Sequence, residues 1–140
     1  MLAPRIRFLL VADSPGHTTG YYVVARALRE AGVEVILSGH AQPEQIVEIA
    51  IQEDVDWIGY RIMDREPLVV VGRLMELLAE QGHLQVRVVV GGIIARKDIE
   101  RLKQAGVEAV FRPGSSLDDI VAAVLRNDCR QASPGGPMHD

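Results

Sequence analysis

The sequence predicts a single α/β domain built on a doubly wound parallel sheet, and three observations lead to this fold class. Five short apolar runs alternate with five helical patterns, an arrangement typical of parallel sheets with crossover helices. Apolar residues make up 48% of the chain and aromatic residues only 4%, a composition typical of strands buried on both faces. A chain of 140 residues is also the size of one domain, which buries about 68 to 70% of the surface of its unfolded form.

The strands are predicted where Val, Ile and Leu gather between residues that favour turns. The predicted ranges are 5–12, 34–37, 56–62, 86–90 and 109–111. The third and fourth are expected to be central strands, because continuous apolar runs such as Val88-Val89-Val90 indicate burial on both faces. With right-handed crossovers, the commonest order of five such strands is 2-1-3-4-5, the flavodoxin-like (Rossmann-like) arrangement with helices on both faces.

The helices are predicted from apolar residues at helical spacing and from signals at their ends. They are expected at 19–31, after Pro43, from 67 until 82, at 97–105, and behind Ser115-Ser116. Glycines at 32, 82 and 106 follow three of these helices, where a left-handed residue is favoured. Because the pattern ends near residue 126, we expect a domain over 1–126 and a flexible tail over 127–140.

Charge and composition argue against several classes of partner. The net charge is -4 and no basic residues cluster, so a nucleic-acid partner is not expected. No run of 18 apolar residues and no signal-peptide pattern is present, so we expect no membrane association and a cytoplasmic location. The single cysteine, Cys129, cannot form an intramolecular disulfide, which fits a reducing compartment.

The predicted strand order puts a ligand at the carboxyl ends of strands one and three, where the order reverses. In the loop after strand one, Gly16 and Gly20 allow close approach of the backbone, and Thr18 or Thr19 can cap the following helix. His17 can bind a metal, transfer a proton or cap the helix. No second metal ligand follows at a suitable spacing, so a lone histidine ligand makes sense only for a metal carried in a macrocycle.

This loop and two later segments together resemble the cobalamin-binding domains of methylmalonyl-CoA mutase and related acyl-CoA mutases. That family carries an Asp-x-His-x-x-Gly loop, then Ser-x-Leu after strand three and Gly-Gly after strand four. The matching segments here are Pro15-Gly16-His17-Thr18-Thr19-Gly20, Arg61-Ile62-Met63 and Gly91-Gly92. The spacing agrees, with 40 residues between the first and second segments and 27 between the second and third. Stretches such as VVARALREAGVEVI and AVFRPGSSLDDIV also resemble the acyl-CoA mutase branch, so the similarity spans about residues 5–126.

The resemblance implies a function, a cofactor and a partner. His17 would bind the cobalt of cobalamin as the lower axial ligand, and the cofactor's nucleotide tail would enter a cleft between the sheet and a helix. The residues implied to contact the cofactor are Gly16, His17, Thr18, Thr19, Gly20, Arg61, Met63, Gly91, Gly92, Gly114, Ser115 and Ser116. The chain would be the small subunit of an adenosylcobalamin-dependent acyl-CoA mutase, a radical isomerase, and would not be catalytic alone. A large barrel subunit would bind the acyl-CoA, and a homo-oligomer is compatible with the sequence.

Two positions depart from the family pattern. Pro15 stands where the family has the aspartate that accepts the second N–H of the histidine, a group whose loss typically costs about 10- to 100-fold in metal affinity or activity. Asp13 could replace that aspartate only if the loop folds back. Arg61 replaces the serine of Ser-x-Leu, and either obstructs the cleft, meets an anion such as the cofactor's phosphate, or pairs locally with Asp64 or Glu66.

Other interpretations of the same residues remain open. Gly91-Gly92 can simply end a strand, and Ser115 or Ser116 can simply cap a helix. The whole chain can be a degenerate module that serves as an interaction or regulatory subunit, or that binds another anionic ligand. A phosphoreceiver domain shares the strand order and needs acids at the ends of strands one and three. It also needs a lysine after strand five, where this chain has Arg112-Pro113.

Overall fold

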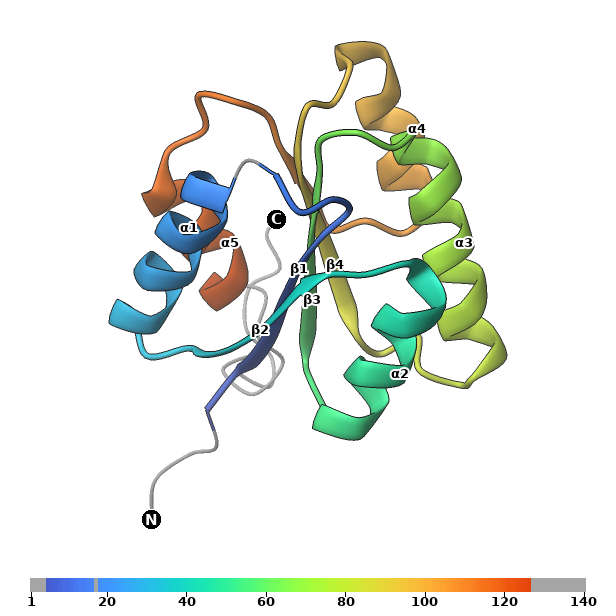
Figure 1. The fold of residues 1–140 in the computed structure, drawn as a ribbon, viewed down its shortest axis with the longest axis horizontal. Coiled ribbons are helices and arrows are strands. Elements are labelled where there is room, and N and C mark those ends of the chain that lie inside the picture. Colours follow the sequence, from blue (N-terminus) through green and yellow to red (C-terminus); the bar gives the residue numbers. More distant parts are fainter. Residues whose placement is uncertain (1–4, 17, 127–140) are drawn as a thin grey trace, which may run out of the picture.

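The computed structural model describes residues 5–16 and 18–126, and it has the predicted architecture (Figure 1). The strands are β1 (Arg7–Ala12), β2 (Glu34–His40), β3 (Trp57–Ile62), β4 (Arg87–Gly92) and β5 (Ala109–Phe111). The helices are α1 (Thr18–Glu30), α2 (Pro43–Glu53), α3 (Pro67–Glu80), α4 (Ile99–Gln104), preceded by the 3-10 turn η1 (Arg96–Asp98), and α5 (Leu117–Arg126). The predicted tail, 127–140, and His17 lie outside the described residues.

The sheet is parallel and its strands follow the predicted order β2-β1-β3-β4-β5. Helices α1 and α5 cover one face, while α2, α3 and α4 cover the other (Figure 1). Because all strands run in one direction, their carboxyl ends lie at one edge, and the order reverses there between β1 and β3. The reversal of strand order on which the predicted ligand site depends is therefore present at this edge.

Two strands are longer than the sequence predicts. Strand β2 extends to His40, which pairs with Ala12 beyond an irregularity in register. Strand β4 includes Gly91 and Gly92, which pair with Arg61 and Ile62 of β3. The two glycines therefore end the strand and do not follow it.

The helix ends depend on the glycines that the sequence indicated. Gly32, Gly82 and Gly106 all have positive φ angles, of 94°, 72° and 117°, and each stands just after a helix. Glycine adopts this left-handed conformation without the steric cost that other residues incur. The fourth helix departs from prediction, because it is preceded by the η1 turn and its α-helical part begins only at Ile99.

Each face of the sheet has its own apolar core. On the α2–α3–α4 face, Leu9, Ile58 and Val88 are fully buried. On the α1–α5 face, Trp57 is 1% exposed and lies at 6.4 Å between ring centroids from Phe8, at an interplanar angle of 20°. Side chains in a strand alternate between faces, so the second core uses every other residue of each strand. This alternation also decides which residues face the candidate site.

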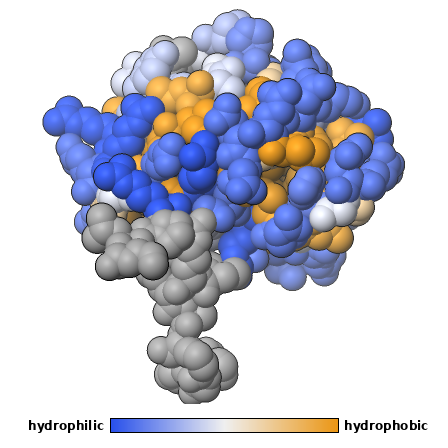
Figure 2. Space-filling model, turned by 90° about the horizontal axis from the view of Figure 1, so that it is seen from below, coloured by the Kyte–Doolittle hydropathy of each residue, from blue (hydrophilic) through white to orange (hydrophobic). Residues whose placement is uncertain are grey.

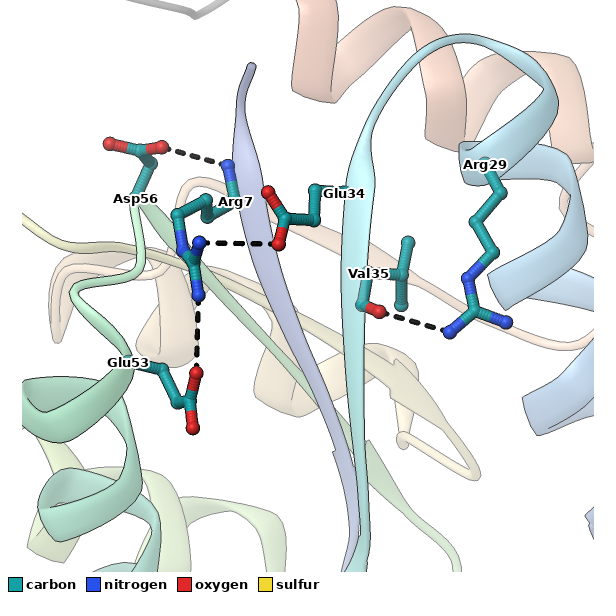
Figure 3. Close-up of polar contacts among 6 residues, drawn as sticks. All are labelled: Arg7, Arg29, Glu34, Val35, Glu53 and Asp56. Atoms are coloured by element: carbon teal, nitrogen blue, oxygen red, sulfur yellow. Dashed lines mark hydrogen bonds and ion pairs between the residues drawn. The ribbon is translucent and has the colours of Figure 1, made fainter. Parts of the chain in front are cut away.

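The amino end of the sheet is held by an ionic cluster around Arg7 (Figure 3). The Arg7 backbone N–H donates to the Asp56 carboxylate at 2.8 Å, and its guanidinium meets Glu34 at 3.2 Å and Glu53 at 3.1 Å. Figure 2 views this end, where hydrophilic side chains separate the hydrophobic areas. These acids hold three elements together at the edge opposite to the ligand site.

Among the residues that the structure describes, no helix combines the length and apolarity needed to span a membrane.

Candidate functional site

A cavity of about 350 Å³ lies on the α1–α5 face, toward the carboxyl ends of the central strands. Its floor is formed by every other residue of three adjacent strands: Phe8 and Leu10 of β1, Gly59 and Arg61 of β3, and Val89 and Gly91 of β4. Helices α1 and α5 supply the walls through Tyr21, Val24 and Ile120, among others. The volume is within the lower part of the range for small-molecule pockets.

Glycines in the floor leave the space that the cavity occupies. A Cβ at Gly59 would lie 2.5 Å from Cε1 of Phe8, so this glycine makes room for the phenylalanine ring beneath the cavity. A Cβ at Gly91 would meet only the Phe111 carbonyl oxygen, at an ordinary contact distance of 3.4 Å. Gly91 is therefore not required for packing, and its missing side chain leaves the cavity open at the end of β4.

Gly92 has a different role from its neighbour. Its φ angle is +112°, and a Cβ there would overlap the carbonyl oxygen of Ile62. The next residue, Ile93, donates its backbone N–H to that same oxygen at 2.9 Å. Gly92 therefore allows the close approach of β4 to β3 as the chain leaves the sheet.

Arg61 reaches across the top of the cavity to helix α1. A Cβ at Gly20 would lie 3.0 Å from Nη2 of Arg61 and 3.5 Å from Cζ, so the guanidinium lies directly against this glycine. Both residues line the cavity. Obstruction of the cleft was one of the alternatives for Arg61, and the structure has a cavity of about 350 Å³ that this residue lines.

Asp13 connects the two loops that flank the site. It is 6% exposed, and its carboxylate accepts backbone N–H groups from Met63 at 3.0 Å, Asp64 at 2.9 Å and Arg65 at 2.7 Å. Burial raises the pKa of Asp13, but the hydrogen bonds from these backbone groups outweigh it and hold the pKa below the ordinary value of 3.8. The carboxylate is thus directed to the loop after β3.

Tyr21 fixes α1 on the sheet. Its hydroxyl donates to the Leu10 carbonyl oxygen at 3.0 Å and accepts from the Gly39 backbone N–H at 2.9 Å. Burial raises the pKa of this hydroxyl, so it stays protonated and keeps its donor role. Tyr22, the next residue, is 56% exposed and meets the Tyr21 ring edge-on.

The loop between β5 and α5 forms the far side of the opening. Arg112, Gly114 and Ser115 line the cavity, and Gly114 has a φ angle of +97°. Arg112 is held in place because its Nε donates to the Ile94 carbonyl oxygen at 2.9 Å. Ser116 accepts the backbone N–H of Asp119 on its Oγ at 3.0 Å, which is the geometry of a helix cap.

The structure therefore brings together many of the residues that the sequence indicated. Those that line the cavity are Gly20, Arg61, Met63, Gly91, Gly92, Gly114 and Ser115. Those described but not lining it are Gly16, Thr19 and Ser116. The position of His17 and the side chain of Thr18 lie outside what the structure describes. Among the described residues, no group of three or more His, Cys, Asp or Glu could hold a metal ion by itself.

Sequence reasoning missed the apolar lining of the cavity, including Phe8, Gly59 and Phe111. A signal was present, because Gly59 lies two residues before Arg61 and so faces the same side of β3. Glycine inside an apolar strand also indicates a close approach by another group.

Comparison with known proteins agrees with this geometry. The family model described as "B12 binding domain" matches residues 8–127, which is most of the chain. The small subunit of 2-hydroxyisobutanoyl-CoA mutase from Aquincola tertiaricarbonis is 38% identical over 131 residues, covering 89% of this chain and 96% of that protein. The small subunit of pivalyl-CoA mutase from Xanthobacter autotrophicus is 41% identical over 110 residues, covering 78% and 74%.

Methylmalonyl-CoA mutase from Cereibacter sphaeroides is a much longer relative. It is 32% identical over 123 residues, which cover 86% of this chain but only 17% of that protein. The present chain thus corresponds to one part of the longer enzyme.

Solved structures show the same fold at low sequence identity. A cobalamin-binding protein from Desulfitobacterium hafniense has a TM-score of 0.72 at 17% identity, covering 87% of this chain and 58% of that one. The signal receiver domain of the putative response regulator NarL from Mycobacterium tuberculosis has a TM-score of 0.68 at 19% identity, covering 89% and 96%. The likeness to the receiver domain is one of fold alone.

Proposed function

Because this chain belongs to the family of B12-binding domains, we propose that it is the cobalamin-binding small subunit of an adenosylcobalamin-dependent acyl-CoA mutase. The observation that carries the proposal is the cavity between the sheet and helices α1 and α5, at the carboxyl end of a doubly wound sheet. Two relatives named as small subunits of CoA mutases match this chain over most of their own length. The mutase role thus requires a second subunit.

The residues around the cavity fit the nucleotide tail of cobalamin. Its flat aromatic base needs an apolar slot, and Phe8, Phe111 and Val89 provide apolar walls. Its ribose and phosphate need polar groups near the opening, where Arg61 and Ser115 line the cavity.

The proposed role of His17 is that of the lower axial ligand of cobalt. It immediately precedes helix α1 in the sequence, and helix α1 begins at the carboxyl edge of the sheet. The Asp13 carboxylate accepts three backbone N–H groups of the β3–α3 loop, which is the role that the described residues give it.

The contribution of this chain is to hold and orient the cofactor, because the chemistry belongs to the cofactor itself. Adenosylcobalamin supplies a cobalt–carbon bond whose homolysis starts a radical rearrangement of the carbon skeleton. The apolar side chains in the floor of the cavity would keep water away from a nucleotide tail bound there. The Asp13 hydrogen bonds keep the β3–α3 loop in a fixed position at the rim.

Exposed apolar side chains at the carboxyl edge support a partner on that edge. Tyr22 near the start of α1, Val69 near the start of α3 and Ile93 after β4 are 56%, 66% and 59% exposed. All three lie at the end of the molecule where the cavity opens. Exposed apolar side chains at the edge where a site opens support a partner protein at that edge. The proposed partner is a large barrel subunit that binds the acyl-CoA.

The experiment is titration of the purified chain with cobalamin, followed by its visible absorbance. Binding through His17 shifts the spectrum, and His17→Ala abolishes the shift. His83→Ala is the matched control, because His83 follows α3 at the opposite edge of the sheet. A bound cofactor whose spectrum is the same in His17→Ala would remove this histidine from cobalt, with the cofactor's own base retained. Absence of binding by the unchanged chain would reject the proposed function.

A further inference from the structure

The longest of the five strands described lies at an edge of the sheet. Strand β2 has seven residues, β1, β3 and β4 have six each, and β5 at the other edge has three. An edge strand has a row of backbone N–H and C=O groups on its free side, which can pair with a strand of another molecule. Because a very short strand offers few such groups, β2 is the edge at which strand addition has to be prevented.

The hydrogen bonds of β2 identify the backbone groups on its free side. The Glu34 N–H donates to the Ile6 carbonyl oxygen at 2.9 Å, so Glu34 faces β1. The backbone groups of successive residues in a strand point to opposite sides, so those of Val35 and Leu37 point away from β1. The segment Val35-Ile36-Leu37 is wholly apolar and has two β-branched residues, which favours pairing with a further strand.

Arg29 covers one of these groups on the free side. It lies in the last turn of α1, and its Nη2 donates to the Val35 carbonyl oxygen at 3.0 Å. Figure 3 shows this side chain on the side of β2 that faces away from β1. A further strand would lie about 4.8 Å from β2, in the space that the guanidinium enters. Arg29 therefore stands in the path of such a strand and occupies an acceptor that it would use.

The other end of the β2 edge is interrupted by a change in register with β1. At this irregularity the Tyr21 hydroxyl bridges the two strands, donating to the Leu10 carbonyl oxygen at 3.0 Å and accepting from the Gly39 N–H at 2.9 Å. Such irregularities bend and twist a strand, which makes its edge a poor template for pairing. The regular part of the free edge thus ends near Leu37, and Arg29 covers its beginning.

We propose that Arg29 closes the free edge of β2 against a second copy of this chain. The edge is complementary to its own copy, because antiparallel pairing about a twofold axis matches each donor with an acceptor of the other molecule. Pairing of this kind has to displace two guanidinium groups, one from each copy. This role of Arg29 is independent of any ligand in the cavity.

The test removes the guanidinium and keeps most of the side chain that carries it. Arg29→Met has a long apolar side chain but no donor for the Val35 carbonyl. Sedimentation velocity of the full chain over a range of concentrations measures the dissociation constant of the dimer. Arg29→Met is expected to lower this constant about 10-fold or more, the effect of one additional hydrogen bond from each copy. The amide hydrogen exchange of Leu37 is expected to slow as Arg29→Met associates, because this N–H faces the added strand.

Arg26→Met is the matched control. Arg26 lies in the same helix, is exposed and pairs with Glu30 at 3.0 Å, so the substitution removes the same charge and leaves the Val35 carbonyl covered. Its dimer dissociation constant is expected to stay within about 2-fold of that of the unchanged chain, as for other exposed charges. Circular dichroism verifies the fold of each variant. If Arg29→Met does not fold, Arg29→Leu, which also has no donor, is measured in its place.

Three results would contradict the inference. A dissociation constant of Arg29→Met equal to that of the unchanged chain would mean that the guanidinium does not control the edge. Equal strengthening of association by Arg29→Met and Arg26→Met would assign the effect to net charge. Association of Arg29→Met without slower exchange at Leu37 would place the contact elsewhere on the molecule.

Discussion

At the scale of single residues, Asp13 is the group on which the geometry of the rim depends. One carboxylate at the end of β1 accepts three consecutive backbone N–H groups that lie 50 to 52 residues further along the chain. Hydrogen bonds to a charged carboxylate are stronger than those between neutral groups, so these three bonds hold the loop after β3 in place.

Replacement of Asp13 by asparagine is expected to destabilise the protein by about 1 to 3 kcal/mol, because an amide N–H₂ group cannot accept a backbone N–H. Urea denaturation at neutral pH measures this loss. Asp64→Asn is the control, since Asp64 lies in the same loop and is exposed. Equal stability of the two variants would contradict the role given to Asp13.

The same replacement changes the dependence of stability on pH. The pKa of Asp13 is lower in the folded protein than its ordinary value of 3.8. Its contribution is therefore fully present above the unfolded pKa and is lost as the pH falls through the folded pKa. The difference in stability between the unchanged chain and Asp13→Asn should shrink at acid pH, and a constant difference would contradict this assignment.

At the scale of elements, the end of β4 combines two glycines with opposite requirements. Gly91 faces the cavity on the same side as Val89, and it has space for a methyl group. Gly92 has a positive φ angle and no space for one. Gly91 thus keeps the cavity open, whereas Gly92 allows the close approach of β4 to β3.

Alanine at each position should therefore give different results. Gly92→Ala is expected to lower the free energy of unfolding by about 2 kcal/mol or more, because strain and overlap both oppose the native backbone. Gly91→Ala is expected to keep the stability within about 1 kcal/mol but to weaken cobalamin binding about 10-fold, since its methyl group enters the cavity. Denaturation and calorimetry measure the two effects. A Gly91→Ala protein that binds as tightly as the unchanged chain would contradict the proposed place of the ligand.

At the scale of the whole molecule, the cavity lies between two layers, so a ligand there contacts both the sheet and the α1–α5 layer. Such a ligand binds only the folded chain, and stabilisation follows from mass action. Cobalamin at 100 times its dissociation constant is expected to add about 2.7 kcal/mol to the free energy of unfolding, seen as a rise of several degrees in Tm. The rise should grow with ligand concentration and be smaller for Gly91→Ala. A Tm independent of cobalamin concentration would contradict binding in this cavity.

Much of the fold was predictable from the sequence because its signals are local. Apolar runs alternate with helical patterns, and the handedness of crossovers then leaves few possible strand orders. Strand β5 has the predicted bounds, 109–111. The extension of β2 was not predictable, because Ser38, Gly39 and His40 continue no apolar pattern, and the strand continues there through the pairing of His40 with Ala12 of β1.

The site was predictable only in part, for a physical reason. Glycines near strand ends and an arginine at the end of the third strand are visible in the sequence, and Gly20, Arg61 and Gly91 do line one cavity. The roles of Asp13 and Tyr21 depend on which backbone groups face them from distant segments. No local pattern specifies those partners. Ser116 was predictable from a local pattern, since its position before α5 predicts the helix cap that the structure has.

The two hydrogen bonds of the Tyr21 hydroxyl have a mechanical consequence. They join α1 to β1 and to the end of β2, which ties this wall of the cavity directly to the sheet. The opposite wall, α5, is joined to β5 through a short segment that contains Gly114, a residue with a positive φ angle. If the cavity widens to admit a ligand, we expect the α5 wall to move by rotation about the segment that contains Gly114, while the α1 wall keeps its place on the sheet.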